Sequence, residues 1–484
     1  MEVIYYSVYI LFALLAGFMV VLALGLGLHF EGLVERHLVP MIPMLIPLAI
    51  GTSSIVSGRN VSFYGLIGAE GLTLADPIGG WILRLTTASI VCASVVVLLS
   101  SLMRKKHHGE RSGDPLFMAF LAYFGSCYIV SGVLGSEPSF VHNNFYALIV
   151  FFVAYATRNQ SVDRFVCWAR NGLNIFIFMG LAVAPILPEV AIQDGYSGII
   201  PGITFRFWGL ATHANNLGPI SVVFLLLLRW KPYHSRALNL LSATAALGSL
   251  LLSQSKTALI AGIAALIVLL GYHLFDSIRQ AKKGKHVTLA QFTWISGPFL
   301  LILSLLVVIS VGIEFGLWKD LLARFGTQAS TLTGRDFIWT ITLREWHENP
   351  LFGYGPRLWG DEFAARQGYL GVVSNAHNQF VDVLGSSGLL GLLCFSAYLL
   401  LLLRYAWLSV GSTEGVSLAL AVFILMRCLT EVPFKTGNIT TPDFLMHFIF
   451  FSALLRARYM PRTAEAQTHA SKKRSRLPRT SFSS

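Results

Sequence analysis

The sequence predicts an all-α polytopic membrane protein with about 12–14 transmembrane helices and one large extracytoplasmic loop that carries short helices. The first observation is composition: 55% of the 484 residues are hydrophobic and only 12% are charged, against roughly 25% charged in a soluble domain. The second is a mean hydropathy of +0.65. A soluble enzyme and most nucleic-acid-binding proteins are thereby excluded, despite a net charge of +12.

The third observation is a series of apolar runs near the roughly 20 residues that a membrane span requires. The N-terminal run lacks a basic leader and a convincing cleavage site, so we expect it to remain as a span. With the C-terminal tail in the cytoplasm, thirteen spans would place the N-terminus outside. We therefore expect that one of 38–57 and 58–77 is broken or re-entrant, or that one run is miscounted. The runs cover 5–28, 38–57, 78–103, 115–134, 144–157, 165–188, 207–228, 237–253, 257–275, 289–315, 379–403, 415–430 and 442–456.

Basic residues in the connectors predict the orientation. Arginine and lysine gather in alternate connectors, such as 104–111 and 279–285, and in the C-terminal tail, whereas 135–143 and 189–204 contain neither. By the positive-inside rule the basic connectors and the tail are cytoplasmic. The tail, residues 457–484, is expected to be disordered and held near anionic lipid.

These patterns predict four parts of the chain: N-terminal transmembrane helices (1–315), a large periplasmic loop (316–378), C-terminal transmembrane helices (379–456) and the basic tail (457–484). Structureless loops longer than about 15 residues are uncommon and usually functional.

Within this loop, residues 335–346 have helical apolar spacing. Thr333 or Gly334 is a possible cap, Pro350 a stop, and 352–356 a turn.

No sequence feature predicts a metal, a cofactor or a nucleotide. The five cysteines stand singly in or beside apolar runs, without a CxxC pair, which fits small hydrophobic residues rather than a zinc site or disulfides. Fingerprints of phosphate-binding loops, zinc proteases, serine hydrolases and dinucleotide-binding folds are missing.

Four ionisable residues on the predicted outer side are the candidate site. Arg206 begins a span, Lys256 lies in a polar patch between two runs, Arg335 lies in the loop, and His377 stands where the loop re-enters the membrane. Positive charge there breaks the positive-inside rule and requires an anionic partner. Several converging cations suit a diphosphate, which arginine can bind in a bidentate manner.

Each residue also has an ordinary structural interpretation. Arg206 and Lys256 could extend to the interface, Arg335 could be a loop cation with acidic neighbours, and His377 could be a helix cap or core residue. Arg427 and Glu431 are four residues apart and are expected to pair with each other.

Several segments together resemble the O-antigen ligase and polymerase family. Residues 331–339 (Thr-Leu-Thr-Gly-Arg-Asp-Phe-Ile-Trp) and 349–355 (Asn-Pro-Leu-Phe-Gly-Tyr-Gly) look like its loop signature. Residues 376–391, which begin Ala-His-Asn-Gln-Phe, are similar to the element that follows the loop. Residues 205–218 and 253–257 are similar to upstream elements, although many members have Arg where Lys256 stands.

The resemblance implies an inverting-type, metal-independent glycosyltransferase without cofactors, multi-pass in a bacterial inner membrane and active at its periplasmic face. Its donor would be a glycan on undecaprenyl diphosphate. Arg206 and Arg335 would hold the diphosphate, with Lys256 assisting. His377 would be a general base for the acceptor hydroxyl or a phosphate contact, so His377 and Arg335 are the expected catalytic residues. Expected partners are the glycan acceptor, membrane lipids and a chain-length regulator protein, but no nucleic acid.

Within the family two activities compete. The Thr-Leu-Thr-Gly-Arg and Ser-Lys-Thr-Ala segments look more like polymerases of O-antigen or exopolysaccharide repeat units. The alternative is a ligase that transfers the glycan to the lipid A–core of lipopolysaccharide, and a protein O-oligosaccharyltransferase is a third option. A transporter of lipid-linked glycans or solutes is a different class, which few mid-span charges and one large one-sided loop disfavour.

Overall fold

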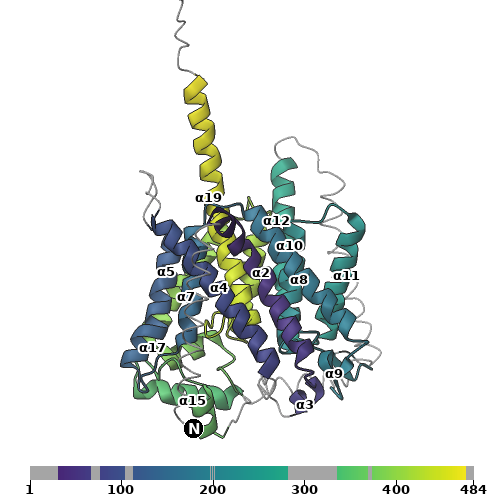
Figure 1. The fold of residues 1–484 in the computed structure, drawn as a ribbon, viewed down its shortest axis with the longest axis vertical. Helices are drawn as coiled ribbons and strands as arrows, with labels where there is room; N and C mark the ends of the chain where they lie inside the picture. The colour runs from purple at the N-terminus through teal and green to yellow at the C-terminus, as the bar shows by residue number, and fades with distance from the viewer. Residues whose placement is uncertain are drawn as a thin grey trace, which may run out of the picture.

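The computed structural model describes residues 31–66, 77–103, 113–196, 198, 200, 202–281, 335–368 and 373–475. Within them the chain is mostly helical, and six helices are long and apolar enough to cross a membrane (Figure 1). Three shorter apolar helices lie among them. The prediction of an all-α polytopic membrane protein is confirmed.

The helices follow the predicted apolar runs closely. Runs 5–28 and 289–315 lie outside the described residues, and of 58–77 the structure describes a short helix, α3 (Val61–Leu66), and its entry. The other runs correspond to α2 (Glu31–Val56), α4 (Pro77–Met103), α5 (Pro115–Phe124) continued by the π-helix η1 (Gly125–Val130) and α6 (Ser131–Leu134), α7 (His142–Ala156), α8 (Val162–Val183), α10 (Ala214–Trp230), α11 (Arg236–Leu252), α12 (Lys256–Ala281), α17 (Gln379–Leu408), α18 (Val416–Cys428) and α19 (Pro442–Ser475).

Polar side chains mark where several helices begin. Asp114 accepts hydrogen bonds from the N–H groups of Leu116 and Phe117, and Pro115 occupies the first turn of α5. The Asn378 side chain accepts hydrogen bonds from the N–H groups of Phe380 and Val381 at the start of α17. Such caps satisfy N–H groups that a helix end leaves without partners.

Aromatic rings from four helices fill the middle of the bundle. Phe120, Phe151, Tyr398 and His447 come from α5, α7, α17 and α19, and ring centroids of neighbouring pairs lie 4.2–6.1 Å apart. The Tyr398 hydroxyl and His447 Nε2 are 2.7 Å apart, which gives these buried polar atoms a hydrogen bond. This packing fixes α17 and α19, and with them the segments that flank the site.

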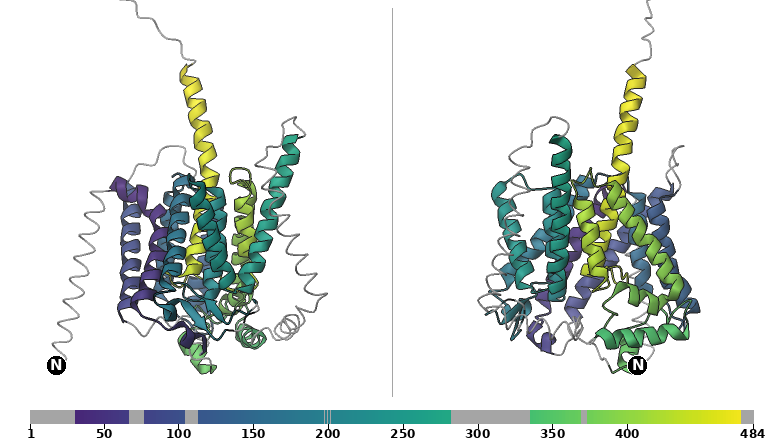
Figure 2. Two further views of the ribbon diagram at one scale, coloured as in Figure 1. Left: turned by 90° about the vertical axis from the view of Figure 1, so that its right-hand side faces the viewer. Right: turned by 180° about the vertical axis from the view of Figure 1, so that it is seen from behind.

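The short elements gather at one end of the bundle, opposite the end from which α19 projects (Figures 1 and 2). They are α3, α9 (Pro188–Ala191), the strands β1 (Ile192–Asp194) and β2 (Phe205–Phe207), α15 (Arg335–Glu348) and α16 (Asp361–Arg366). The two strands pair antiparallel, with Gln193 opposite Arg206. We call this the site end of the bundle.

The expected loop helix and its stop are present. α15 runs from Arg335 to Glu348 and ends before Pro350, while Thr333 and Gly334 lie outside the described residues. Around α15 and α16 a small separate core forms from residues such as Ile338, Trp359 and Phe363. The described part of the loop is therefore a packed unit and not a loose connector.

Three details differ from the sequence-based expectation. α10 begins at Ala214 rather than 207, because Phe207 belongs to β2. α17 contains a kink at Gly388 (φ +63°), where a Cβ would lie 2.3 Å from the backbone of Leu351. α19 continues to Ser475 into the tail expected to be disordered, where Ala, Glu, Gln, Lys and Arg favour a helix.

Candidate active site

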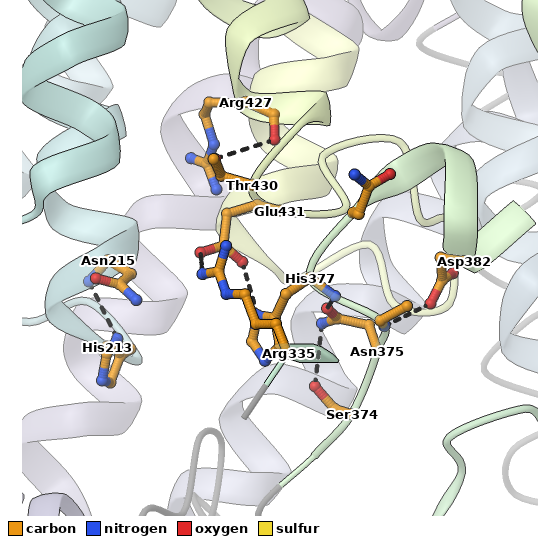
Figure 3. Close-up of polar contacts among 12 residues, drawn as sticks. His213, Asn215, Arg335, Ser374, Asn375, His377, Asp382, Arg427, Thr430 and Glu431 are labelled. Atoms are coloured by element: carbon orange, nitrogen blue, oxygen red, sulfur yellow. Dashed lines mark hydrogen bonds and ion pairs between the residues drawn. The ribbon is translucent and has the colours of Figure 1, made fainter. Parts of the chain in front are cut away.

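A shared carboxylate joins two of the predicted site residues at the site end (Figure 3). His377 Nδ1 lies 3.1 Å from Glu431 Oε2, and Arg335 lies 3.6 Å from the other oxygen, Oε1. The three side chains are between 11% and 18% exposed. They come from segments far apart in the sequence: α15, the entry to α17 and the turn after α18.

Polar groups of residues 375–382 hold the turn that carries His377. The His377 N–H donates to Asn375 Oδ1 at 2.8 Å, and the Ala376 N–H donates to Asp382 Oδ1 at 2.9 Å. These bonds accommodate the left-handed backbone of His377, whose φ is +48°. A residue other than glycine adopts this conformation only when its surroundings enforce it. The motif therefore fixes the imidazole before any substrate arrives.

α15 is attached to the same segment. The Trp339 indole N–H donates to the Ala376 carbonyl at 2.8 Å, which joins the helix that begins with Arg335 and the turn that carries His377 into one unit. The Gln379 side chain accepts the Phe434 N–H at 2.9 Å and thereby ties this unit to the turn after α18.

Glu431 is held as a carboxylate. Burial raises the pKa of the Glu431 carboxyl. The hydrogen bond from His377 and the positive charges of His377, Arg427 and Arg335 lower it by more, so the net pKa is below the ordinary value. An ionised Glu431 accepts the proton on His377 Nδ1, which places the imidazole lone pair on Nε2. Glu431 Oε1 is buried and has no hydrogen-bond partner among the described residues. This carboxylate–histidine pair is the arrangement that orients a general base.

The expected pairing of Arg427 with Glu431 is wrong. Arg427 instead lies 3.2 Å from Asp443 Oδ1 at the start of α19. The Glu431 N–H still donates to the Arg427 carbonyl at 2.7 Å, as in a further helical turn, but the two side chains have different partners. The Glu431 side chain turns toward Arg335 and His377 instead (Figure 3).

Arg206 forms a second part of the site. It lies in β2, is 7% exposed, and donates from Nε to the Ser253 carbonyl at 2.8 Å and from a terminal nitrogen to Asn215 Oδ1 at 2.6 Å. Its guanidinium stacks 4.8 Å from the centre of the Tyr196 ring. Both acceptors are uncharged, and these contacts hold the guanidinium in one orientation.

Lys256 lies next to Arg206 because of a strained turn. Gln254 has a φ of +49° and donates to the Phe205 carbonyl at 2.7 Å, which ends α11 and starts α12 at Lys256. Arg206 and Lys256 are close enough to repel each other electrostatically. Two neighbouring cations of this kind favour the binding of an anion with several negative oxygens.

His213 connects the two parts. Burial, and after it the positive charge of Arg206, lower its pKa to about 3; His377 also lowers the pKa, whereas Glu431 acts in the opposite direction. It therefore remains neutral, and its Nδ1 accepts the Asn215 N–H at 3.1 Å. His213 and Asn215 lie across from Arg335 and His377 (Figure 3).

The four sequence-predicted residues are thus all at the site end, as two groups: Arg206 with Lys256, and Arg335 with His377. Sequence reasoning missed Glu431 as a member, left His213 unassigned and did not notice Arg59. Arg59 is 4% exposed and donates to the carbonyls of Val190 and Gly209. Within the described ranges, no three His, Cys, Asp or Glu side chains gather as metal ligands would.

Fold and site together define a multi-pass, all-α membrane protein with a cationic pair and a carboxylate-linked histidine at one end. Residues 240–396 match the family model for O-antigen ligase. The match agrees with the resemblance seen in the sequence: these residues are similar to the O-antigen ligase domain, and the similarity supports an enzyme of that type. Lys256, Arg335 and His377 lie inside the matched region, and Arg206 and Glu431 outside it. No curated protein matches the chain.

Proposed function

We propose that the protein transfers a glycan from an undecaprenyl-diphosphate carrier to a hydroxyl acceptor at the periplasmic face of a bacterial inner membrane. The observation that carries the proposal is the Glu431 carboxylate, which contacts His377 and Arg335 at the end of the bundle that also holds Arg206 and Lys256. This arrangement supplies a base and a set of cations, as displacement of a diphosphate by a sugar hydroxyl requires.

The two groups of site residues have different roles in the reaction. His377 Nε2 accepts the proton of the acceptor hydroxyl, whose oxygen attacks the anomeric carbon of the donor. The bond from that carbon to the diphosphate oxygen breaks, and the carrier diphosphate leaves with the bonding electrons. Glu431 stabilises the imidazolium that forms, and Arg206, Lys256 and Arg335 stabilise the charge of the leaving group. Attack opposite the leaving group inverts the anomeric centre.

Polymerisation of repeat units is the first candidate, because the Thr-Leu-Thr-Gly-Arg and Ser-Lys-Thr-Ala segments favour it. Transfer to the lipid A–core of lipopolysaccharide is the second, and the description of the matching family as O-antigen ligase supports it. In a polymerase the acceptor is another carrier-linked repeat unit, and a chain-length regulator protein would be a partner.

The test uses purified full-length protein in detergent with a carrier-linked repeat unit, alone and with lipid A–core, and His377→Ala as the inactive variant. His347→Ala is the matched control, because His347 is an exposed histidine on α15. A ladder from the donor alone establishes a polymerase; a product that requires lipid A–core establishes a ligase.

No product from wild-type protein under either condition contradicts the proposal. So does full activity of the His377→Ala variant. A transporter would instead move the carrier-linked unit across proteoliposomes and lose that transport when His377 is replaced.

A further inference from the structure

A cavity at the opposite end of the bundle has no part in the proposed reaction. It measures about 260 Å³ and lies between the start of α5, the end of α17 and the part of α19 that leaves the bundle. One water occupies roughly 30 Å³ in the liquid, so the cavity admits a phosphate group with a glycerol attached. By the positive-inside rule this end is the cytoplasmic one.

Two arginines line this cavity without a carboxylate partner. Arg404 comes from α17 and Arg458 from α19. Among the described residues neither side chain forms a hydrogen bond or an ion pair. Both are at least partly exposed, so their charges are accessible from the cavity.

The acidic residue in the lining, Asp114, is occupied elsewhere. Its Oδ1 caps α5 through the N–H groups of Leu116 and Phe117, and its Oδ2 accepts the Tyr405 hydroxyl at 2.8 Å. These partners are uncharged, so Asp114 keeps its negative charge, and the lining carries two guanidinium groups against one carboxylate.

A third arginine lies beside the lining. Arg158 stacks 5.0 Å from the ring of Tyr459, which is a lining residue. Arginine side chains in a pocket between helices at the cytoplasmic surface are suited to bind the negatively charged oxygens of a phosphate-bearing headgroup.

We propose that the cavity lined by Arg404 and Arg458 is a phosphate-binding site, separate from the proposed active site, that holds the phosphate of an anionic headgroup or of a soluble phosphate ester. The two guanidinium groups bind the phosphate oxygens, and Tyr459 borders the same space. The helix junction of α5, α17 and α19 is then braced by the bound anion.

The test titrates delipidated full-length protein with phosphatidylglycerol and, in a second arm, with glycerol 3-phosphate. Bound phosphatidylglycerol is counted by native mass spectrometry, and glycerol 3-phosphate binding is followed by thermal shift. The variant is Arg404→Gln/Arg458→Gln, and the control is Arg236→Gln/Arg279→Gln, which removes the same charge from exposed residues of α11 and α12 outside the cavity.

We expect the first variant to weaken binding roughly tenfold and the control to bind like the wild type. Binding of phosphatidylglycerol alone assigns the phosphate to a lipid, and equal binding of glycerol 3-phosphate assigns it to a soluble ester. Undiminished binding by the Arg404→Gln/Arg458→Gln variant, an equal loss in both variants, or no binding in either arm overturns the proposal.

Discussion

At the residue scale, the site depends on side chains that compete for one carboxylate. Glu431 lies 3.1 Å from His377 and 3.6 Å from Arg335. The sequence alone did not reveal this, because the spacing of Arg427 and Glu431 predicts a pair on a continuous helix. Arg335 and His377 could be selected because positive charge on the outer side departs from the positive-inside rule and because both residues lie in segments that resemble the family.

Replacement of Glu431 by Gln is expected to lower the rate of glycan transfer at least about 100-fold, because the imidazolium loses its counter-charge and the histidine its orientation. The KM for the carrier-linked donor should change little. Rates measured over a range of donor concentrations separate the two effects. Glu348→Gln, at an exposed position of α15, is the control, and a Glu431→Gln enzyme as fast as this control contradicts the assigned role.

Replacement of Lys256 by Gln is expected to raise the KM for the donor about tenfold, since the proposed reaction loses one of the cations assigned to the diphosphate. Thermal stability should stay close to that of the wild type, because Lys256 is partly exposed. Kinetics at increasing salt provide the measurement, with Arg357→Gln as an exposed cationic control at the same end. An unchanged KM would show that Lys256 does not meet the donor.

Buried His213 makes stability depend on pH. Its pKa is about 3 in the folded protein and 6.5 for an ordinary histidine, so between these values the unfolded chain binds a proton that the folded protein does not. Stability is therefore full above about pH 6.5 and falls as the pH is lowered, by about 1–2 kcal/mol at pH 5. Glu431 acts in the same direction at lower pH, because its lowered pKa stabilises the fold above the ordinary 4.5 and that stability is lost as the pH falls through the lowered value.

We expect His213→Asn, which can still cap α10, to flatten the decline of the melting temperature between pH 7 and pH 5. Thermal unfolding followed by tryptophan fluorescence at several pH values measures this slope. Parallel curves for the variant and the wild type would contradict the contribution assigned to His213.

At the scale of elements, membrane spans are predictable because length and hydropathy suffice to define them. The residues at which helices begin at the site end could be determined only from the structure. The turn that ends α11 is held by the bond from Gln254 to the Phe205 carbonyl, and Asn378, which caps α17 locally, also donates to the Leu429 carbonyl. Such contacts between segments leave no periodic signal in the sequence.

The kink in α17 is expected to be sensitive to substitution. A Cβ at Gly388 would meet the backbone of Leu351, and its φ of +63° adds strain, so Gly388→Ala should lower the melting temperature and separate the loop unit from α17. Gly248→Ala is the matched control, because a Cβ there meets nothing within 4 Å and alanine favours the helix. Differential scanning fluorimetry of both variants distinguishes the effects, and equal melting temperatures would contradict the steric argument.

At the scale of the whole molecule, the site and the basic cavity lie at opposite ends of one bundle, joined by α17 and α19. Helix α17 carries His377 at its entry and Arg404 near its other end. The alternating basic connectors were enough to predict which end of the bundle carries most of the Lys and Arg residues. The convergence of Arg206 with Lys256 was not, because β2 and the α11–α12 turn meet only through tertiary contacts.

Sidedness can be measured directly. In a variant without native cysteines, Glu348→Cys should react with a membrane-impermeant maleimide added to intact cells whose outer membrane has been permeabilised. Ser235→Cys, at the basic end of α11, should react only after the inner membrane is opened. Reaction of the two positions in the reverse order would overturn the assigned orientation.

The shared carboxylate has a thermodynamic consequence for the order of events. An anion that binds Arg335 adds negative charge beside His377, and a proton that His377 takes up adds positive charge beside that anion. Each event therefore favours the other, and linkage requires that they do so by the same factor. In the proposed reaction, proton uptake by His377 and retention of the departing diphosphate therefore reinforce each other.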